Sequence, residues 1–312
     1  MSLSDSNPAR ADPSLRGDTN VRHFACTSCG KCCNRGPEME LSEATLLADK
    51  FVTSLLFKVH SLPSNERSQW AADWWETQKS RVPLRPALDE HRRHLKNFAS
   101  RRVVEKHRER QIFLTISAIV DDDGQGRCPA LAGKLCGIYE IRPQTCRTVP
   151  LHYSRSPSVL QNYLDDFTNT PVYQCDTSSV APIILNRNNV VDFKIRESRE
   201  KAIGLAKADR SWKKHILALM DDAEQAREVG LPTYDAVLTN SDNGYATELP
   251  MIVAWRVAKR NNILSVAKLH DLCGKQIRLI EAEIARVPED RRMIDLIEKL
   301  SVYKFELKQD QQ

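Results

Sequence analysis

The chain has 312 residues, 41% hydrophobic and 28% charged, which suits one large domain or two smaller ones with a true hydrophobic core. Its net charge of +5 permits an acidic partner without requiring nucleic acid. No secretory signal is visible, and no run approaches the roughly 20 apolar residues of a membrane helix. We therefore expect a soluble cytoplasmic protein without membrane contact, in a compartment that keeps thiols reduced.

The first hundred residues divide into a polar lead-in, a cysteine loop and a long helical stretch. Residues 1–20 lack hydrophobic periodicity and predict a disordered lead-in. After the cysteines, apolar residues at helical spacing from Leu41 to Val59 predict a helix, with Ser42 as its N-cap. Helical periodicity continues through a basic insertion at about 60–110.

The second hundred residues contain the clearest strand. Residues 112–120 are rich in β-branched side chains and end in the acidic turn 121–126. This strand predicts a short two- or three-stranded element whose turn leads into the second cysteine segment. A further short strand fits Val190–Phe193.

Helical patterns dominate the C-terminal third. They cover 194–230, where Gly230 marks a stop, and then 251–286 and 289–308, with a loop at 240–244 between the two parts. The predicted fold class is α+β, with a small cysteine-rich metal-binding core followed by a mainly α-helical region. The predicted boundaries are 21–190 for the cysteine-cluster domain and 191–312 for the helical extension.

Four of the nine cysteines lie within eight positions near the start of the chain. Cys26, Cys29 and Cys32 follow a C-x2-C-x2-C spacing, which lets one tight loop direct three thiolates at one centre. Cys33 is the informative addition. Because neighbouring side chains diverge, it is expected to serve a second centre, a bridge or a free thiol rather than the ion held by Cys32.

A second set of cysteines lies about a hundred residues further on, at Cys128, Cys136, Cys146 and Cys175. The gaps are too long for one metal knuckle, so the fold must bring these thiols to the first loop. Cys273 stands alone in a predicted helix, and a small buried apolar residue is its simplest interpretation.

The thiols indicate a metal core without deciding which metal. Zinc and iron–sulfur clusters both accept four thiolates, and clustered cysteines in a reducing compartment favour ligands over disulfides. Eight thiols allow two four-thiolate sites, a cluster beside a structural zinc, or a single site with spare cysteines.

These cysteines carry a family resemblance. The doubled cysteine after Cys26-x2-Cys29-x2-Cys32, and the string Cys136-Gly-Ile-Tyr-Glu-x-Arg-Pro-x-x-Cys146-Arg, resemble the YkgJ-type cysteine-cluster family over roughly residues 22–180. That family is described as a zinc- or iron-chelating domain. The resemblance extends to flagellin lysine-N-methylase, whose cysteines are associated with a [4Fe–4S] centre.

The resemblance implies a metal core, and the residues around it allow two interpretations of the basic side chains in the string. The implied metal ligands are Cys26, Cys29, Cys32, Cys33, Cys128, Cys136, Cys146 and Cys175. In the structural interpretation, Glu140 and Arg142 hold the loop together by an ion pair or by bonding backbone carbonyls. In the functional one, Arg142 or Arg147 offsets thiolate charge from a second shell around the cofactor. We favour the structural role. The basic insertion and the helical extension depart from the short members of the family.

Three functions remain open from the sequence, and whether the protein is an enzyme is not decided. The first is a metal protein with a structural or redox centre and a redox or protein partner. The second is a protein-lysine methyltransferase using S-adenosylmethionine, although no G-x-G-x-x-G follows a strand. The third is a zinc-stapled module for a protein or for nucleic acid. In this third case the basic stretch 91–110 could bind the phosphate backbone of a nucleic acid, but the solvent-exposed face of an ordinary helix has the same sequence pattern.

Overall fold

The computed structural model describes residues 20–33, 35–78, 83–288 and 291–309, so the predicted disorder of 1–20 lies outside it apart from Asn20. The described elements form an α+β fold, as predicted. None of the described helices combines the length and the apolar content that crossing a membrane needs.

A five-stranded antiparallel sheet occupies the middle of the molecule. Its two long strands, β3 (Thr53–Pro63) and β5 (Arg110–Val120), pair along their whole length. At the edges, β10 (Thr247–Pro250) pairs with β3, and both β2 (Glu38–Met39) and β4 (Ala99–Glu105) pair with β5. The strand predicted at 112–120 is confirmed, but the short two- or three-stranded element expected around it is wrong. The sheet has five strands, because β2 and β10 from distant parts of the chain pair at its edges.

The helix predicted from Leu41 to Val59 is wrong beyond its first turns. Helix α1 (Leu41–Leu46) is short, and the chain then enters β3. Leu55, Leu56 and Phe57 are all buried, because both faces of this strand are covered. A strand buried on both faces loses its alternating pattern, so its apolar run resembles a helix in sequence.

Three smaller predictions are corrected by the structure. The N-cap position of α1 is Glu40 rather than Ser42, whose N–H donates to the Asp209 carboxylate at 2.9 Å. The insertion at 60–110 is only partly helical, since it also contains the end of β3, all of β4 and the start of β5. Helix α9 (Tyr234–Asp242) covers most of the loop expected at 240–244.

The remaining elements before residue 193 surround the sheet and the cysteines. Two helices, α2 (Gln69–Gln78) and α3 (Leu84–Leu95), follow β3, and the others are short or belong to small sheets. These are β1 (Val21–His23), η2 (Lys106–Arg108), β6 (Leu131–Ala132), β7 (Leu135–Cys136), η3 (Tyr139–Ile141), α4 (Gln144–Arg147), η4 (Pro157–Val159), α5 (Leu160–Thr168), β8 (Ile183–Asn186) and β9 (Asn189–Val190). The strand expected at Val190–Phe193 is therefore displaced, because Phe193 already begins the next helix.

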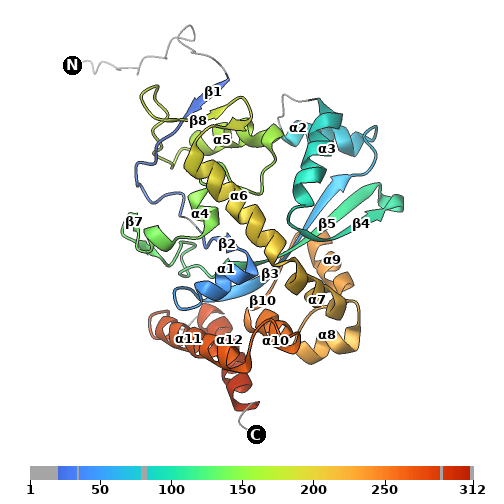
Figure 1. Ribbon diagram of the computed structural model, residues 1–312, viewed down its shortest axis with the longest axis vertical. Coiled ribbons are helices and arrows are strands. Elements are labelled where there is room, and N and C mark those ends of the chain that lie inside the picture. Colours follow the sequence, from blue (N-terminus) through green and yellow to red (C-terminus); the bar gives the residue numbers. More distant parts are fainter. Residues whose placement is uncertain (1–19, 34, 79–82, 289–290, 310–312) are drawn as a thin grey trace, which may run out of the picture.

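The C-terminal part is helical apart from β10, as predicted. Its other helices are α6 (Phe193–Ala208), α7 (Arg210–Met220), α8 (Ala223–Val229), α10 (Ile252–Arg260), α11 (Val266–Ile284) and α12 (Arg291–Gln309). Gly230 ends α8 in the left-handed conformation, at φ 80°, which confirms the predicted stop. In Figure 1, α10, α11 and α12 gather at the lower end of the molecule, while β1, β8 and α5 lie at the upper end.

The sheet and the C-terminal helices share one hydrophobic core. Buried side chains of β3 and β5 pack in the same cluster as those of α7, α10, α11 and α12. Cys273 is fully buried in this cluster, which confirms its interpretation as a core residue. Gln276 adds a polar link, since its amide donates to Ala48 O and Phe51 O (2.8 and 2.7 Å) and accepts from Thr53 N at 3.1 Å.

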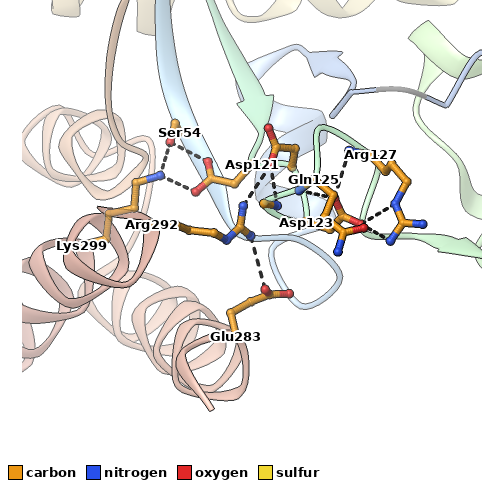
Figure 2. A network of polar contacts seen from close by, with 10 residues as sticks. Ser54, Asp121, Asp123, Gln125, Arg127, Glu283, Arg292 and Lys299 are labelled. Atoms are coloured by element: carbon orange, nitrogen blue, oxygen red, sulfur yellow. Dashed lines mark hydrogen bonds and ion pairs between the residues drawn. The ribbon is translucent and has the colours of Figure 1, made fainter. Parts of the chain in front are cut away.

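The turn that leads to the second cysteine segment is tied to the last two helices (Figure 2). Lys299 of α12 pairs with Asp121 and donates to Ser54 Oγ at 2.9 Å. Arg292, also of α12, donates to Asp122 at 3.0 Å and to Glu283 of α11 at 3.3 Å. These contacts fix the chain just after β5, which ends eight residues before Cys128.

Candidate metal centre

The first thiol group forms where the N-terminal loop meets residues 174–176. Ala25 N donates to Asp176 O at 2.8 Å and Asp176 N donates to Ala25 O at 3.1 Å. This bridge sets Cys26 and Cys175 beside each other, one residue from the paired positions. Burial, together with the charges of three neighbouring thiols, raises the pKa of the Cys175 thiol to about 11. These three are Cys29, Cys32 and Cys26.

The loop between Cys26 and Cys33 is bent by two left-handed residues, Ser28 (φ 57°) and Gly30 (φ 71°). A Cβ on Gly30 would lie 3.1 Å from Lys134 O, so the loop touches the turn of the β6–β7 hairpin. Backbone N–H groups of Lys31 and Gln174 donate to Cys29 and lower the pKa of its thiol. Backbone donors of this kind stabilise a thiolate, the form that binds metal.

The second thiol group forms on the other side of the same loop. Cys128 N donates to Cys33 O at 3.1 Å, and the β6–β7 hairpin then returns the chain to Cys136. Cys146 lies in α4. Burial, together with the charges of Cys128 and Cys136, raises the pKa of the Cys146 thiol to about 12. Cys33 interacts electrostatically with the same three thiols.

The two groups meet at Cys32 and Cys33. The two thiols hydrogen-bond to each other, which raises the pKa of Cys32 and lowers that of Cys33. The expectation that these side chains diverge is therefore wrong, because the turn after Gly30 brings both to one side of the loop. Each still lies with a different set of partners, Cys32 with Cys175 and Cys33 with Cys128.

The eight thiols lie near one another, but their sulfur atoms are not arranged as ligands around a common metal ion. Among the residues that the structure describes, no three His, Cys, Asp or Glu side chains are already positioned to hold one ion. The donors nevertheless fit a thiophilic metal, because all eight are cysteine sulfurs. Seven of these cysteines are half-buried and only Cys26 is exposed.

The basic residues of the second segment have separate tasks. Arg147 Nε donates to Arg142 O at 2.9 Å, and its guanidinium also donates to Glu140 O, so Arg147 closes the loop around η3. Arg142 stacks on the Tyr139 ring with its guanidinium carbon 3.8 Å from the ring centroid. It also lies close enough to Cys146 to lower the pKa of that thiol slightly against the effect of burial.

Sequence reasoning missed two contributors to this site, the backbone donors at Gln174 and the carboxyl group of Glu43. Glu43 accepts from Gln144 N at 2.8 Å, and burial raises the pKa of its carboxyl group to about 7. Neither has a signal in the sequence, because both depend on segments more than a hundred residues apart.

The cysteine segments contribute little to the hydrophobic core. Among described residues 25–38 and 121–150, no aliphatic or aromatic side chain other than proline is buried. Small segments that lack such a core usually need a metal or a disulfide to stay folded.

Much of the basic stretch at 91–110 is paired within the chain. Arg101 makes a two-pronged contact with Asp221, while Arg110 binds Asp242 and Glu105 at 2.6 and 2.5 Å. These pairs join β4 and β5 to the C-terminal helices. Nucleic-acid binding by this stretch stays a prediction.

Clustered, half-buried thiols on segments without a hydrophobic core define a cysteine-cluster metal-binding protein. Residues 25–176 match the model of the CxxCxxCC family, described as "Putative zinc- or iron-chelating domain", so this part of the chain carries that family's domain. Comparison with curated proteins and with solved structures gave no significant match. The resemblance to the cysteine-cluster family is thus confirmed, and the metals to consider are zinc and iron.

Proposed function

We propose that this protein holds metal in two four-thiolate centres, which secure the two cysteine segments to each other and to the sheet. The first centre comprises Cys26, Cys29, Cys32 and Cys175. The second comprises Cys33, Cys128, Cys136 and Cys146. The observation that carries this proposal is the gathering of all eight thiols in segments without buried aliphatic or aromatic side chains.

Each thiol group has the number of donors that a tetrahedral zinc ion or a [4Fe–4S] cluster requires. Metal binding would supply the folding free energy that these segments lack, on the order of 10 kcal/mol for a structural zinc site. The chain's own contribution is to place the donors. Backbone N–H groups favour the thiolate of Cys29, and Arg142 partly offsets negative charge at Cys146.

A redox role is the second candidate, favoured by the contact between Cys32 and Cys33. Because adjacent residues belong to the two groups, two clusters bound there would be joined by a single peptide unit. Such proximity would suit electron transfer between them and to a redox partner. The methyltransferase alternative rests on the resemblance alone, and specific binding of S-adenosylmethionine would be its test.

Anaerobic purification followed by elemental analysis, absorption spectroscopy and a sulfide assay tests the proposal. Stoichiometric zinc in a colourless protein supports the structural role. Iron with acid-labile sulfide and a charge-transfer absorption band supports the redox role. A folded protein that contains neither zinc nor iron, and that gains no stability when either is added, would contradict both.

A further inference from the structure

A second set of polar side chains, separate from the cysteines, lies on the half of the sheet that faces α3. It contains three histidines from three different segments, with one acidic and two basic residues. We call it the histidine cluster. Its members are Glu38 of β2, Lys58 and His60 of β3, His91 of α3, and His152 and Arg155 of the segment after α4.

The three histidines are half-buried, and two of them contact aromatic side chains. His91 meets Trp74 edge-on with 5.7 Å between ring centroids, and His152 stacks on Tyr153 at 4.6 Å. Burial lowers the pKa of His60, His91 and His152 to about 4, so all three rings are neutral at pH 7. Arg155 lies within electrostatic range of each of them.

Hydrogen bonds determine which ring nitrogens carry the protons. Ser154 N donates to His152 Nδ1 at 3.1 Å, so neutral His152 is protonated at Nε2. Thr115 donates its hydroxyl to Lys58 O at 3.2 Å and therefore accepts from His60 Nε2 at 3.3 Å. His60 Nδ1 is then an acceptor, and His152 Nε2–H is a donor that no described side chain uses.

The cationic groups of the cluster also have unused donors. Lys58 pairs with Glu38, which leaves two of its three N–H groups, and its side chain is 39% exposed. The guanidinium of Arg155 lies 4.9 Å from the centroid of the Tyr163 ring and donates to no described side chain. The backbone of this segment is nevertheless fixed, because buried Arg199 donates to Leu151 O, His152 O and Arg155 O at 2.6–2.9 Å.

We propose that the histidine cluster binds a small ligand through an oxyanion, either a phosphate or a carboxylate group. Donors outnumber acceptors here, and the cluster contains two cations and a single carboxylate, which favours a negatively charged ligand with several acceptor oxygens. Neutral imidazoles add hydrogen bonds without a further desolvated charge, and the acceptor nitrogen of His60 suits a protonated oxygen of the ligand.

The site would lie next to the second thiol group. Thr145, the residue before Cys146, donates its hydroxyl to Glu38 O and so joins α4 to the strand that carries the carboxylate. The proposal does not depend on the metal function, since none of the cluster residues is a candidate metal ligand.

Histidine side-chain NMR on the full chain, purified with its metal and labelled with ¹⁵N-histidine, tests this proposal. Inorganic phosphate is titrated at pH 7 and constant ionic strength, and acetate is titrated in parallel. We expect saturable shifts of the His60, His91 and His152 resonances. Arg155→Gln and Lys58→Met should each weaken binding about tenfold or more, the effect of losing a charge-assisted hydrogen bond.

Two control variants lie outside the cluster, His107→Gln and Lys106→Met, both at exposed positions of η2 between β4 and β5. They should leave the affinity unchanged. If the shifts saturate with phosphate but not with acetate, the ligand is a phosphoryl compound. If they saturate with both anions, the site accepts phosphate and carboxylate groups alike. Two results would overturn the proposal. One is a set of shifts that rise linearly with anion concentration and do not saturate. The other is an unchanged affinity in Arg155→Gln, a variant that alters an exposed side chain.

Discussion

The surroundings of the cysteines shift the pKa of their thiols in different directions. Backbone N–H groups lower the pKa of Cys29, whereas burial and neighbouring thiols raise the pKa of Cys146 and Cys175. Eight thiolates so close together would repel one another without a cation. Metal binding would relieve this repulsion and release protons, so metal affinity should rise with pH until the thiols are deprotonated.

His94 of α3 makes stability depend on pH in a predictable way. Its Nε2–H donates to Tyr153 O at 2.9 Å, and burial lowers the pKa of the ring to about 4. The unfolded chain binds this proton near pH 6.5 and the folded chain only near pH 4. The contribution of His94 to folding is therefore complete above pH 6.5 and is lost as the pH falls toward 4.

We predict that His94→Gln, which can keep the hydrogen bond but cannot titrate, flattens the pH dependence of unfolding in this window. The reduction should approach about 1.4 kcal/mol per pH unit for the one proton involved. Chemical denaturation between pH 4.5 and 7.5 measures it. The exposed His107→Gln is the control, and equal slopes for wild type and His94→Gln would refute the assignment.

Strand β2 belongs to the central sheet and begins five residues after Cys33, so it connects the first cysteine loop to the sheet. Gly36 precedes it, and a Cβ at this position would lie 1.8 Å from Val120 O. Pro37 O accepts from Val120 N at 3.1 Å, so the chain cannot move away without losing a sheet contact. Glycine is therefore required here by close approach of two backbones.

Gly36→Ala should reduce the free energy of unfolding by about 2 kcal/mol or more, as overpacking at a fixed backbone does. Gly204→Ala is the matched control, since that position of α6 is open and alanine favours a helix by about 0.5–1 kcal/mol. Thermal and denaturant unfolding of the two variants provide the comparison. Equal stability of Gly36→Ala and wild type would show that β2 can shift.

Local sequence patterns predicted several elements correctly, but they failed where packing against distant parts of the chain determines the secondary structure. The β-branched run at 112–120, the stop at Gly230 and the core position of Cys273 could be predicted because each follows from its own neighbourhood. The apolar run at 55–57 could not be assigned correctly, since burial on both faces depends on helices more than 150 residues later. The division of the thiols rests on the Ala25–Asp176 bridge, which no spacing in the sequence reveals.

Over the whole molecule, the C-terminal helices and the central sheet form one folding unit, and the cysteine segments are attached to it at few points. Lys299 and Arg292 of α12 hold Asp121 and Asp122 (Figure 2), and Gln144 N and the Thr145 hydroxyl donate to Glu43 and to Glu38 O. Loss of metal should therefore loosen the cysteine segments before the shared core unfolds.

The most direct test of the two-centre account is the metal content of paired cysteine variants. Cys26→Ser with Cys175→Ser removes two thiols from the first group, and Cys128→Ser with Cys136→Ser removes two from the second. Metal per chain is measured by elemental analysis, with circular dichroism to confirm that each variant is folded. We predict that each pair loses about half of the metal and keeps the spectrum of the other centre. Complete loss of metal from either folded variant, or no loss from one of them, would contradict the account.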